Sequence, residues 1–500
     1  MLWLCAACLF VTGASLSLVQ QKSTSKAKEP IAALQGCFGL DCVERYAFHE
    51  DGALAWNLQS KERPLFAGYT KYTVEMTSQS WLADVTVNHD GLWNHTLTVV
   101  VPDSLKSNSQ QQPWAMFFIN EQSWLAEEMA KRTGVVCACL TNVPRSGVDF
   151  TFDNRGALDE ETMKAFGFVA YAKHSNHPEW PIEMPSTKAT VKGMDVVQAL
   201  LTDYMPSLSP SKFIVGGASK RGVVAYLTAL VDPRVKALIP AIITLDIDET
   251  AKLRDQALSK GARTVYDDEG VPEALRGEAA DRVKSIINPI QYSARLDMPK
   301  LLMNCGNDDW FPPDQLGLSW HRLPQPKSYY LYPNSHHIGF VKPNNVGTDG
   351  PDFVDTMDAW VNGLVMNKPE PQLTWNVDEI TGEISVQLLS SETASSVRLW
   401  KAETLNGETR DFRNVHWTSE PLDKASRHWQ VTPSPSKGVW QAMFVSFEFP
   451  GPKQGGPKWK RSTEVSVMPK LLPFPVYDNI SASLGRNISL PGYAVGSPAV

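Results

Sequence analysis

The sequence predicts an α/β domain followed by a smaller all-β module. From about residue 97 to residue 332, short β-branched or aromatic runs alternate with helical stretches. After "NKPEPQLTW" the pattern changes to apolar and polar alternation between turns rich in Gly, Pro and Ser. With 500 residues, of which 43% are hydrophobic, the chain has the composition of a folded protein and is long enough for two or more domains with sizeable cores.

Seven apolar runs predict the strands of a mostly parallel sheet. Helices cover both faces of such a sheet, so its strands read as continuous apolar runs. The runs are 97–101, 114–119, 134–140, 212–217, 237–245, 300–304 and 328–332.

Helices are predicted between these runs. One covers 123–134 and closes at Gly134, a second follows a Ser186 cap, and a third covers 221–231 before Pro233. The charged stretch at about 249–290 is predicted to be a helical insertion over one end of the sheet. Insertions at that end often form lids over a site.

The predicted domain organisation has four parts. Residues 1–17 read as a signal peptide, because the apolar stretch from Leu2 to Val11 is too short to span a bilayer and small residues follow it. A buried N-terminal segment is the alternative. Residues 18–368 are predicted to form the α/β domain, 372–475 a β-sandwich-like module and 476–500 an extended tail.

The cysteines fit an exported protein. In an oxidising compartment, Cys37 and Cys42 in "CFGLDC" can close a small disulfide loop. Cys137 and Cys139 are expected to be buried free thiols, because no histidine or further cysteine stands nearby at zinc-ligand spacing. The cluster "HSNHPEWP" at 174–181 is interpreted as a structured loop with a tryptophan anchor, and a pocket wall or metal site is the alternative. We therefore expect no metal and no cofactor.

Charge and hydropathy exclude two classes of partner. The net charge of -7 is spread along the chain, with no basic tract that would bind a run of phosphates, so nucleic acid is not expected. No segment after the N-terminus is apolar for long enough to span a membrane. The sequons at Asn94, Asn479 and Asn487 agree with secretion and glycosylation.

Ser219 in "GGASKRGVV" is the candidate nucleophile. It follows an apolar run and precedes a predicted helix, which is the strand–turn–helix context of a nucleophile elbow. Such a turn drives the serine toward positive φ, and Gly216, Gly217 and Gly222 are expected to supply the space for the helix to pack on the strand. The alternative is a serine in a glycine-rich connection.

Two later strands end in candidate partners for this serine. Asp308 or Asp309 follows the run 300–304, and His336 or His337 follows the run 328–332. The order serine, aspartate, histidine is that of the α/β-hydrolase triad, in which the imidazole takes the serine proton and the carboxylate orients the imidazole. Taken singly, the aspartates read equally well as turn caps and "NSHH" as a surface loop.

Backbone N–H groups are needed to stabilise the oxyanion of an attacked carbonyl. One is expected from Lys220, the residue after the nucleophile, and the other from Asn120 or Glu121, which follow the run 114–119. Lys220 and Arg221 stand at a helix start, where cations are unfavourable. They are either solvated or paired with an acid or an anionic substrate.

With these residues identified, the chain resembles the PhoPQ-activated pathogenicity-related family, which also contains secreted autocrine proliferation repressors. The resemblance covers about residues 40–475 and is carried by "FIVGGASKRGVVAYLTALVDPRVKALIPAIITLDI", "NPIQYSARLDMPKLLMNCGNDDWFPPD" and "YPNSHH". It implies an α/β-hydrolase core with a β-sandwich, and it assigns the acid to Asp308 and the histidine to His337. The family tends to have glycines where this chain has "NEQS", so Glu121 places a carboxylate beside the expected oxyanion hole.

Two functions are therefore considered. The leading hypothesis is a secreted serine hydrolase, an esterase or peptidase that acts on a small molecule or peptide through Ser219, Asp308 and His337. The alternative, implied by the repressor members of the family, is a secreted signalling protein on a hydrolase scaffold that needs no turnover and binds a cell-surface receptor.

Overall fold

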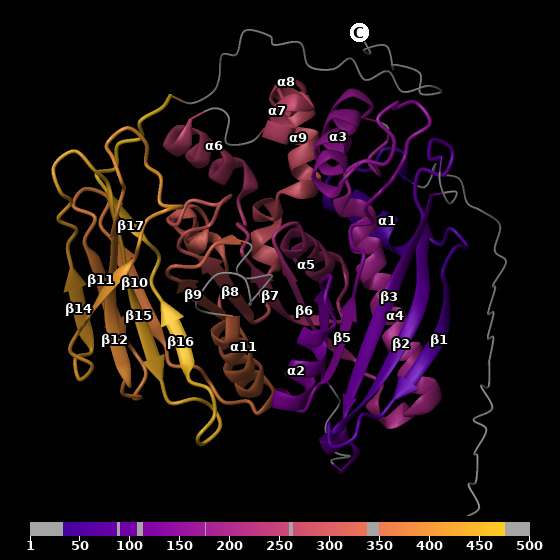
Figure 1. Ribbon diagram of the computed structural model, residues 1–500, viewed down its shortest axis with the longest axis horizontal. Coiled ribbons are helices and arrows are strands. Elements are labelled where there is room, and N and C mark those ends of the chain that lie inside the picture. The colour runs from indigo at the N-terminus through magenta and orange to yellow at the C-terminus, as the bar shows by residue number, and fades with distance from the viewer. Residues whose placement is uncertain are drawn as a thin grey trace, which may run out of the picture.

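The computed structural model describes residues 34–87, 91–107, 114–175, 177–259, 264–337 and 350–475. The predicted signal peptide and tail, and the sequons at Asn479 and Asn487, lie outside these ranges. The described residues form a nine-stranded sheet with helices on both faces, and a second body of antiparallel sheets beside it (Figure 1). The predicted fold class, an α/β-hydrolase core with a C-terminal all-β module, is confirmed.

The large sheet has the strand order β1-β2-β3-β5-β4-β6-β7-β8-β9, and the seven predicted strands occur as β3 to β9. Strands β4 to β9 are parallel, whereas β3 is antiparallel to both β2 and β5. The run at 97–101 is continuously apolar because helices α2 and α4 pack on β3, not because it is parallel. The strands are β1 (Ala55–Glu62), β2 (Tyr69–Ser80), β3 (Leu92–Pro102), β4 (Trp114–Ile119), β5 (Val136–Leu140), β6 (Lys212–Ala218), β7 (Val235–Ala241), β8 (Lys300–Cys305) and β9 (Lys327–Tyr332).

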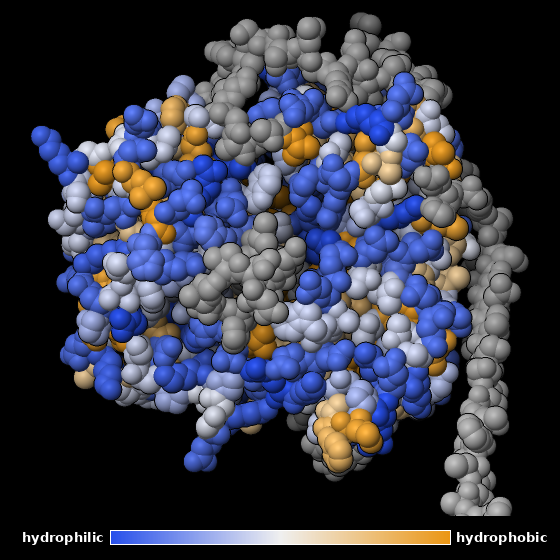
Figure 2. Space-filling view, in the orientation of Figure 1, coloured by the Kyte–Doolittle hydropathy of each residue, from blue (hydrophilic) through white to orange (hydrophobic). Residues whose placement is uncertain are grey.

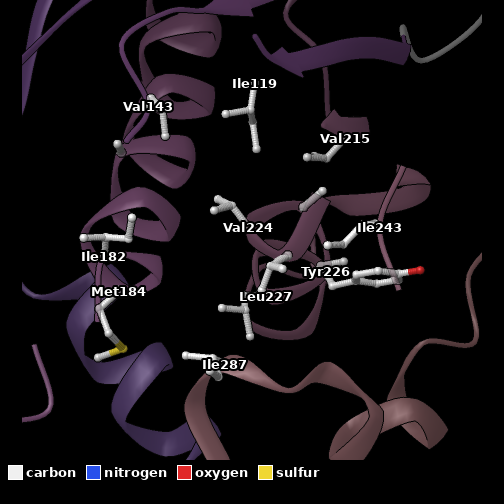
Figure 3. Close-up of a cluster of buried hydrophobic side chains, with 14 of the residues drawn as sticks. Ile119, Val143, Ile182, Met184, Val215, Val224, Tyr226, Leu227, Ile243 and Ile287 are labelled. Carbon is white, nitrogen blue, oxygen red and sulfur yellow. The ribbon is translucent and has the colours of Figure 1, made fainter. Parts of the chain in front are cut away.

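Two groups of helices cover the two faces of this sheet. Alternate strand residues enter one core with α1, α3, α4, α5 and α9, or another core with α2 and α11. Figure 3 shows Val224 and Leu227 of α5 on the side of that helix that faces Ile182 and Met184. The helices are α1 (Leu40–Phe48), α2 (Trp124–Thr133), α3 (Glu160–Lys173), α4 (Glu183–Tyr204), α5 (Lys220–Val231) and α11 (Gly350–Val365).

Helix α4 begins one turn before the predicted Ser186 cap. Pro185 lies in its first turn, where a missing N–H costs no helical hydrogen bond. The hydroxyl of Ser186 donates to the carbonyl of Ile182 at 2.6 Å instead of capping the helix. The cap signal failed because the residue that does precede the helix, Ile182, has no capping side chain.

The stretch predicted as a helical insertion lies between β7 and β8. Residues from each of its helices line the same cavity as Ser219, so the insertion covers the carboxyl ends of the parallel strands (Figure 1). Its helices are α6 (Ile247–Leu258), α7 (Thr264–Asp268), α8 (Val271–Ala274) and α9 (Gly277–Ile287).

The C-terminal module contains a three-stranded sheet, β10-β11-β14, and a larger sheet ordered β13-β12-β15-β16, with β17 also paired to β15. Phe447 of β15 packs on Trp429 of the smaller sheet, with ring centroids 5.0 Å apart. On the other face of β15, Phe444 packs on Trp417 at 5.4 Å. The strands are β10 (Leu373–Val377), β11 (Ile384–Leu388), β12 (Ser396–Glu403), β13 (Thr418–Pro421), β14 (His428–Val431), β15 (Gln441–Phe449), β16 (Trp459–Ser462) and β17 (Ser466–Met468).

The module packs directly on the large sheet. The N–H of Leu331 in β9 donates to the hydroxyl of Ser462 in β16 at 2.9 Å. The ring of Trp459 lies on Gly363 of α11, where a Cβ atom would stand only 1.9 Å from Cη2 of that ring. The two bodies therefore share buried surface along β9 and α11.

The structure joins Cys37 to Cys42 in a disulfide, as predicted from "CFGLDC". Cys137, Cys139 and Cys305 are buried free thiols, and burial raises the pKa of Cys139 to about 12. Within the described ranges, no cluster of three or more His, Cys, Asp or Glu side chains is placed to hold a metal ion.

The molecular face in Figure 2 is largely hydrophilic, and its hydrophobic residues lie in small separate groups. None of the described helices combines the length and the apolar character needed to cross a bilayer.

The contact between Gly363 and Trp459 gives a test of how tightly the module is held. Gly363→Ala should lower the free energy of unfolding by about 1–3 kcal/mol, because the added methyl overpacks the interface even though alanine favours a helix. Thermal unfolding measures the change. Gly317→Ala is the control, since its Cβ would meet only the side chain of Glu464 at 3.6 Å, and a loss as large as that of Gly363→Ala would contradict the packing argument.

Candidate active site

Ser219 occupies a strained turn between β6 and α5. Its backbone has φ 56° and ψ -128°, a conformation that residues with a Cβ rarely adopt. Its N–H donates to the carbonyl of Ala241 in β7 at 2.9 Å, which fixes the turn to the neighbouring strand. A serine at positive φ between a strand and a helix is the geometry of a nucleophile elbow.

Two of the three predicted glycines are required by this turn. A Cβ at Gly217 would lie 2.4 Å from the carbonyl oxygen of Arg221, and a Cβ at Gly222 would lie 2.7 Å from Cγ2 of Ile243. At Gly216 the nearest atoms would be at 3.4 Å, an ordinary van der Waals distance. Gly217 and Gly222 thus allow helix and strand to approach, and Gly216 is not needed for this.

The two aspartates and two histidines form two separate pairs. His337 Nδ1 lies 2.9 Å from Asp308 Oδ2 and 3.0 Å from Oδ1, and both side chains are almost fully buried. His336 Nδ1 lies 3.7 Å from Asp309 Oδ1, in a pair with about a third or more of each side chain exposed. The buried pair leaves Nε2 of His337 as its second ring nitrogen, the one that a triad uses for the serine proton.

Backbone hydrogen bonds hold the carboxylate of Asp308 in place. Its Oδ1 accepts from the N–H of Trp310 at 2.8 Å and from the N–H of Phe311 at 3.0 Å. The ring of Phe311 also lies 5.9 Å from the ring of His337. The loop that carries Asp308 therefore orients its carboxylate independently of the contact with the imidazole of His337.

Ser219 and His337 line the same cavity, which has a volume of about 580 Å³. The insertion helices and α3 supply much of the remaining wall, together with the start of α5, the loop after β4 and the loop that carries Asp308, and the wall is mainly apolar behind the charged groups at Ser219. Arg254 of α6 stacks over the ring of Trp310 at 4.7 Å, beside the Asp308 loop. Prominent apolar lining residues are Phe168, Val271, Leu275, Ile287 and Phe311.

The two predicted oxyanion donors, Lys220 and Asn120, differ in whether the backbone N–H is available. Lys220 begins α5, and the first N–H groups of a helix have no partner within the helix. The N–H of Asn120 already donates to the carbonyl of Leu140 at 3.2 Å, as a continuation of the β4–β5 pairing, so Asn120 is not available as the second donor in this structure. The N–H of Glu121 donates to Oδ1 of the Asn120 side chain at 2.8 Å.

Carboxylates surround the two cations that follow Ser219. Arg221 Nη2 pairs with Glu121 and lies 3.2 Å from Glu160 Oε1. Lys220 Nζ pairs with Glu161 and lies 3.5 Å from Glu160 Oε2. The cations are therefore paired with acids rather than solvated, and the carboxylate of Glu121 is compensated by Arg221.

The ionisation of Glu161 fits this arrangement. Burial acts to raise its pKa, but the ammonium groups of Lys220 and Lys164 outweigh burial and keep the pKa below its ordinary value. The hydroxyl of Tyr266 in α7 also donates to Glu161 Oε2 at 3.0 Å. Glu161 thus links Lys220, the residue after Ser219, to the insertion that covers the cavity.

The other sequence candidates lie away from Ser219. Trp180 is fully buried against Phe166, and His177 Nδ1 lies 3.0 Å from Glu179 Oε1, as expected for an anchored loop. Asn94 stands at an exposed position of β3 and accepts a hydrogen bond from the side chain of Thr77. Neither group lines the cavity.

Sequence reasoning missed the acids that compensate Lys220 and Arg221. Asp159 caps α3 through the N–H groups of Glu161 and Thr162, so "DEET" was a recognisable helix start. A local pattern cannot tell that this helix start lies beside the turn at Ser219.

The sheet topology and the strand–turn–helix geometry at Ser219 are those of the α/β-hydrolase fold. The family model described as PhoPQ-activated pathogenicity-related protein matches residues 43–413, and the chain belongs to that family. Autocrine proliferation repressor protein A of Dictyostelium discoideum is 24% identical over 467 residues, which cover 86% of this chain and 91% of that protein.

Solved structures with a similar fold include two hydrolases. Acetyl xylan esterase from Paenibacillus sp. R4 is 14% identical with a TM-score of 0.45, over 65% of this chain and 92% of the esterase. An S-formylglutathione hydrolase from Agrobacterium tumefaciens is 16% identical with a TM-score of 0.36, over 61% of this chain and 98% of that protein.

The glycines of the turn give a paired test of the elbow geometry. Gly217→Ala should lower the free energy of unfolding by about 2–3 kcal/mol, because its methyl meets the backbone of α5. Gly216→Ala is the matched neighbour, and we expect it to change stability by less than about 1 kcal/mol. Chemical denaturation of both variants measures the difference, and equal effects would contradict the assigned geometry.

Proposed function

We propose that the chain is a secreted serine hydrolase that cleaves an ester or amide bond through Ser219, His337 and Asp308. The observation that carries this proposal is the strained positive φ of Ser219 beside a cavity that it shares with His337. Strain of this kind persists where the surrounding structure fixes it, and it clusters at active sites.

In the proposed reaction, the hydroxyl of Ser219 attacks the carbonyl carbon while Nε2 of His337 takes its proton. Asp308 keeps the proton on Nδ1 and stabilises the imidazolium that forms. His337 then returns the proton to the leaving group, and a water molecule, activated in the same way, releases the acyl group from Ser219.

The proposed oxyanion donors are the N–H groups of Lys220 and Glu121. Lys220 follows the nucleophile at the start of α5, and the N–H of Glu121 is bonded to a side chain, that of Asn120, which can rotate away. The carboxylate of Glu121 would oppose the developing charge, but its pairing with Arg221 offsets this.

The size of the cavity is consistent with a small substrate. A volume of about 580 Å³ lies in the range of pockets that enclose small molecules. Its apolar wall suits a small organic acyl group or a short peptide side chain better than an extended polar chain.

Secretion is also part of the proposal. The disulfide between Cys37 and Cys42 and the exposed sequon at Asn94 support it, together with the apolar N-terminal stretch.

A signalling role without turnover is the second candidate. It rests on the relative named autocrine proliferation repressor protein A, which aligns with most of this chain. A hydrolase scaffold can serve both roles, since a fold does not fix a function.

A fluorophosphonate probe tests the first candidate. The wild-type protein should be labelled at Ser219, and Ser219→Ala and His337→Ala should lose labelling by about 10³-fold or more. His336→Ala is the matched control, because His336 pairs with Asp309 in the more exposed pair and should be dispensable. An unlabelled wild type, or equal loss in His336→Ala and His337→Ala, would refute the assigned triad.

The same Ser219→Ala protein separates the two candidates in a growth assay. If the wild type restrains cell proliferation, loss of this effect in Ser219→Ala ties it to hydrolysis. An unchanged effect supports signalling without turnover.

The ion pair between Arg221 and Glu121 gives a second test at the site. Arg221→Gln should slow fluorophosphonate labelling by about tenfold, because it leaves the carboxylate of Glu121 uncompensated near the oxyanion. Glu121→Gln introduced into Arg221→Gln should restore the rate, since it removes that charge. If the double variant stays as slow as Arg221→Gln, the charge of Glu121 is not the cause.

A further inference from the structure

The loop at residues 404–417, between β12 and β13, reaches from the C-terminal module into the hydrolase domain. It has no helix or strand along its length. Loops of this length within a compact body are uncommon and usually functional. We call it the clamp loop, because it contacts both the loop that carries Asp308 and the loop that carries His337.

The first contact is made by Asn307, the residue directly before Asp308. Its Nδ2 donates to the carbonyl of Phe412 and to the carbonyl of Val415, both at 2.8 Å. Its backbone N–H donates to the carbonyl of Ser335 at 3.1 Å. Asn307 therefore links the loop that carries Asp308 to the loop that carries His337 and to the C-terminal module. Because Asn307 is only 2% exposed, these hydrogen bonds are shielded from water.

The second contact is made by Asn334, three residues before His337. Its Nδ2 donates to the carbonyl of Trp417 at 3.0 Å, and its Oδ1 accepts from the N–H of Trp417 at 2.8 Å. The side-chain amide thus makes the two hydrogen bonds that a neighbouring strand would make. Asn334 has φ 56°, so the histidine loop turns sharply where the module holds it.

Trp417 anchors these contacts in the module. Its side chain is 1% exposed and packs on Phe444 of β15. A Cβ at Gly306 would lie 2.9 Å from Nε1 of Trp417, so the indole lies directly against the chain just before Asn307. Movement of the module relative to β8 would therefore move the acid loop.

A buried ion pair holds the middle of the clamp loop. Arg410 is 4% exposed and pairs with Asp314, with Nη1 3.2 Å from Oδ1 and the second nitrogen also in contact. The N–H of Arg410 donates to the carbonyl of Ala257 in α6 at 3.0 Å. The same loop therefore contacts the insertion that covers the cavity.

We propose that the C-terminal module positions the acid and the histidine of the triad through the clamp loop. Asn307 and Asn334 are the positioning residues, acting through Asp308 and His337 rather than on the substrate. This inference rests on the proposed function. It assigns to the module a role in the rate of the chemical step, beyond its contribution to the folded core.

Labelling of the full chain by a fluorophosphonate separates positioning from packing. At saturating probe, Asn307→Ala and Asn334→Gly should each lower the maximal labelling rate by about 10- to 100-fold, since small misplacement of catalytic groups costs up to about that much. The probe concentration that gives half the maximal rate should stay unchanged, because neither residue lines the cavity. Glycine at 334 keeps the positive φ, so this variant is expected to fold.

Ser462→Ala is the matched control, because it removes a buried hydrogen bond across the same interface at β9, away from the catalytic loops. Rates are measured well below the unfolding temperature of every variant. A fall in rate for Asn307→Ala and Asn334→Gly, with Ser462→Ala at the wild-type rate, supports the proposal. Where Asn307→Ala does not fold, Asn334→Gly decides.

Wild-type rates in Asn334→Gly overturn the positioning role while leaving the hydrolase proposal intact. A fall of equal size in Ser462→Ala also overturns it, because the effect would then follow general interface stability. An unlabelled wild-type protein instead refutes the proposed function, and the positioning role with it.

Discussion

The left-handed backbone of Ser219 is the constraint on which the rest of the site depends. Holding a residue that has a Cβ in this backbone conformation destabilises the folded state by about 1–3 kcal/mol, so contacts around the turn must stabilise it. The hydrogen bond from the N–H of Ser219 to the carbonyl of Ala241 fixes the turn to β7. Because Gly217 and Gly222 have no Cβ, α5 can begin directly after the turn and still pack closely against the sheet. The result is a serine at the head of a helix, facing the cavity under the insertion helices.

The charges around Ser219 follow from that helix start. Lys220 and Arg221 are placed where the dipole of α5 disfavours cations, whereas Glu160 and Glu161 are placed where the dipole of α3 favours anions. Two helix N-termini therefore meet, and the acids favoured by one compensate the cations disfavoured by the other. Glu121 joins the same group from the loop after β4, so its charge belongs to a paired cluster.

Local patterns predicted the strands from β3 to β9 and the turn at Ser219, because continuous apolar runs and glycine spacing are properties of short segments. They missed β1, an edge strand whose residues alternate between exposed and half-buried, and β2 beside it, whose buried positions are interrupted by polar residues. They could not separate Asp308 from Asp309, since the two pairs differ in burial and in distance, which are properties of the folded chain. Local patterns could not predict the hydrogen bonds of Asn307 and Asn334, because their partners lie about a hundred residues away in the sequence.

The same non-local contacts set the limits of the structural unit around Ser219. The change of pattern near residue 370 marks a change of secondary structure and not the end of the packed unit. Strand β15 of the module is buried on both faces, and the family match continues to residue 413, inside the clamp loop. Domains joined only by a tether usually share a modest, polar interface. Here the side-chain amide of Asn307 is buried and donates both of its hydrogens to carbonyls of the module, so these two hydrogen bonds form only when the module is in place. The loop that carries Asp308 therefore depends on the C-terminal module for two buried hydrogen bonds, and the two bodies form one structural unit at the candidate active site.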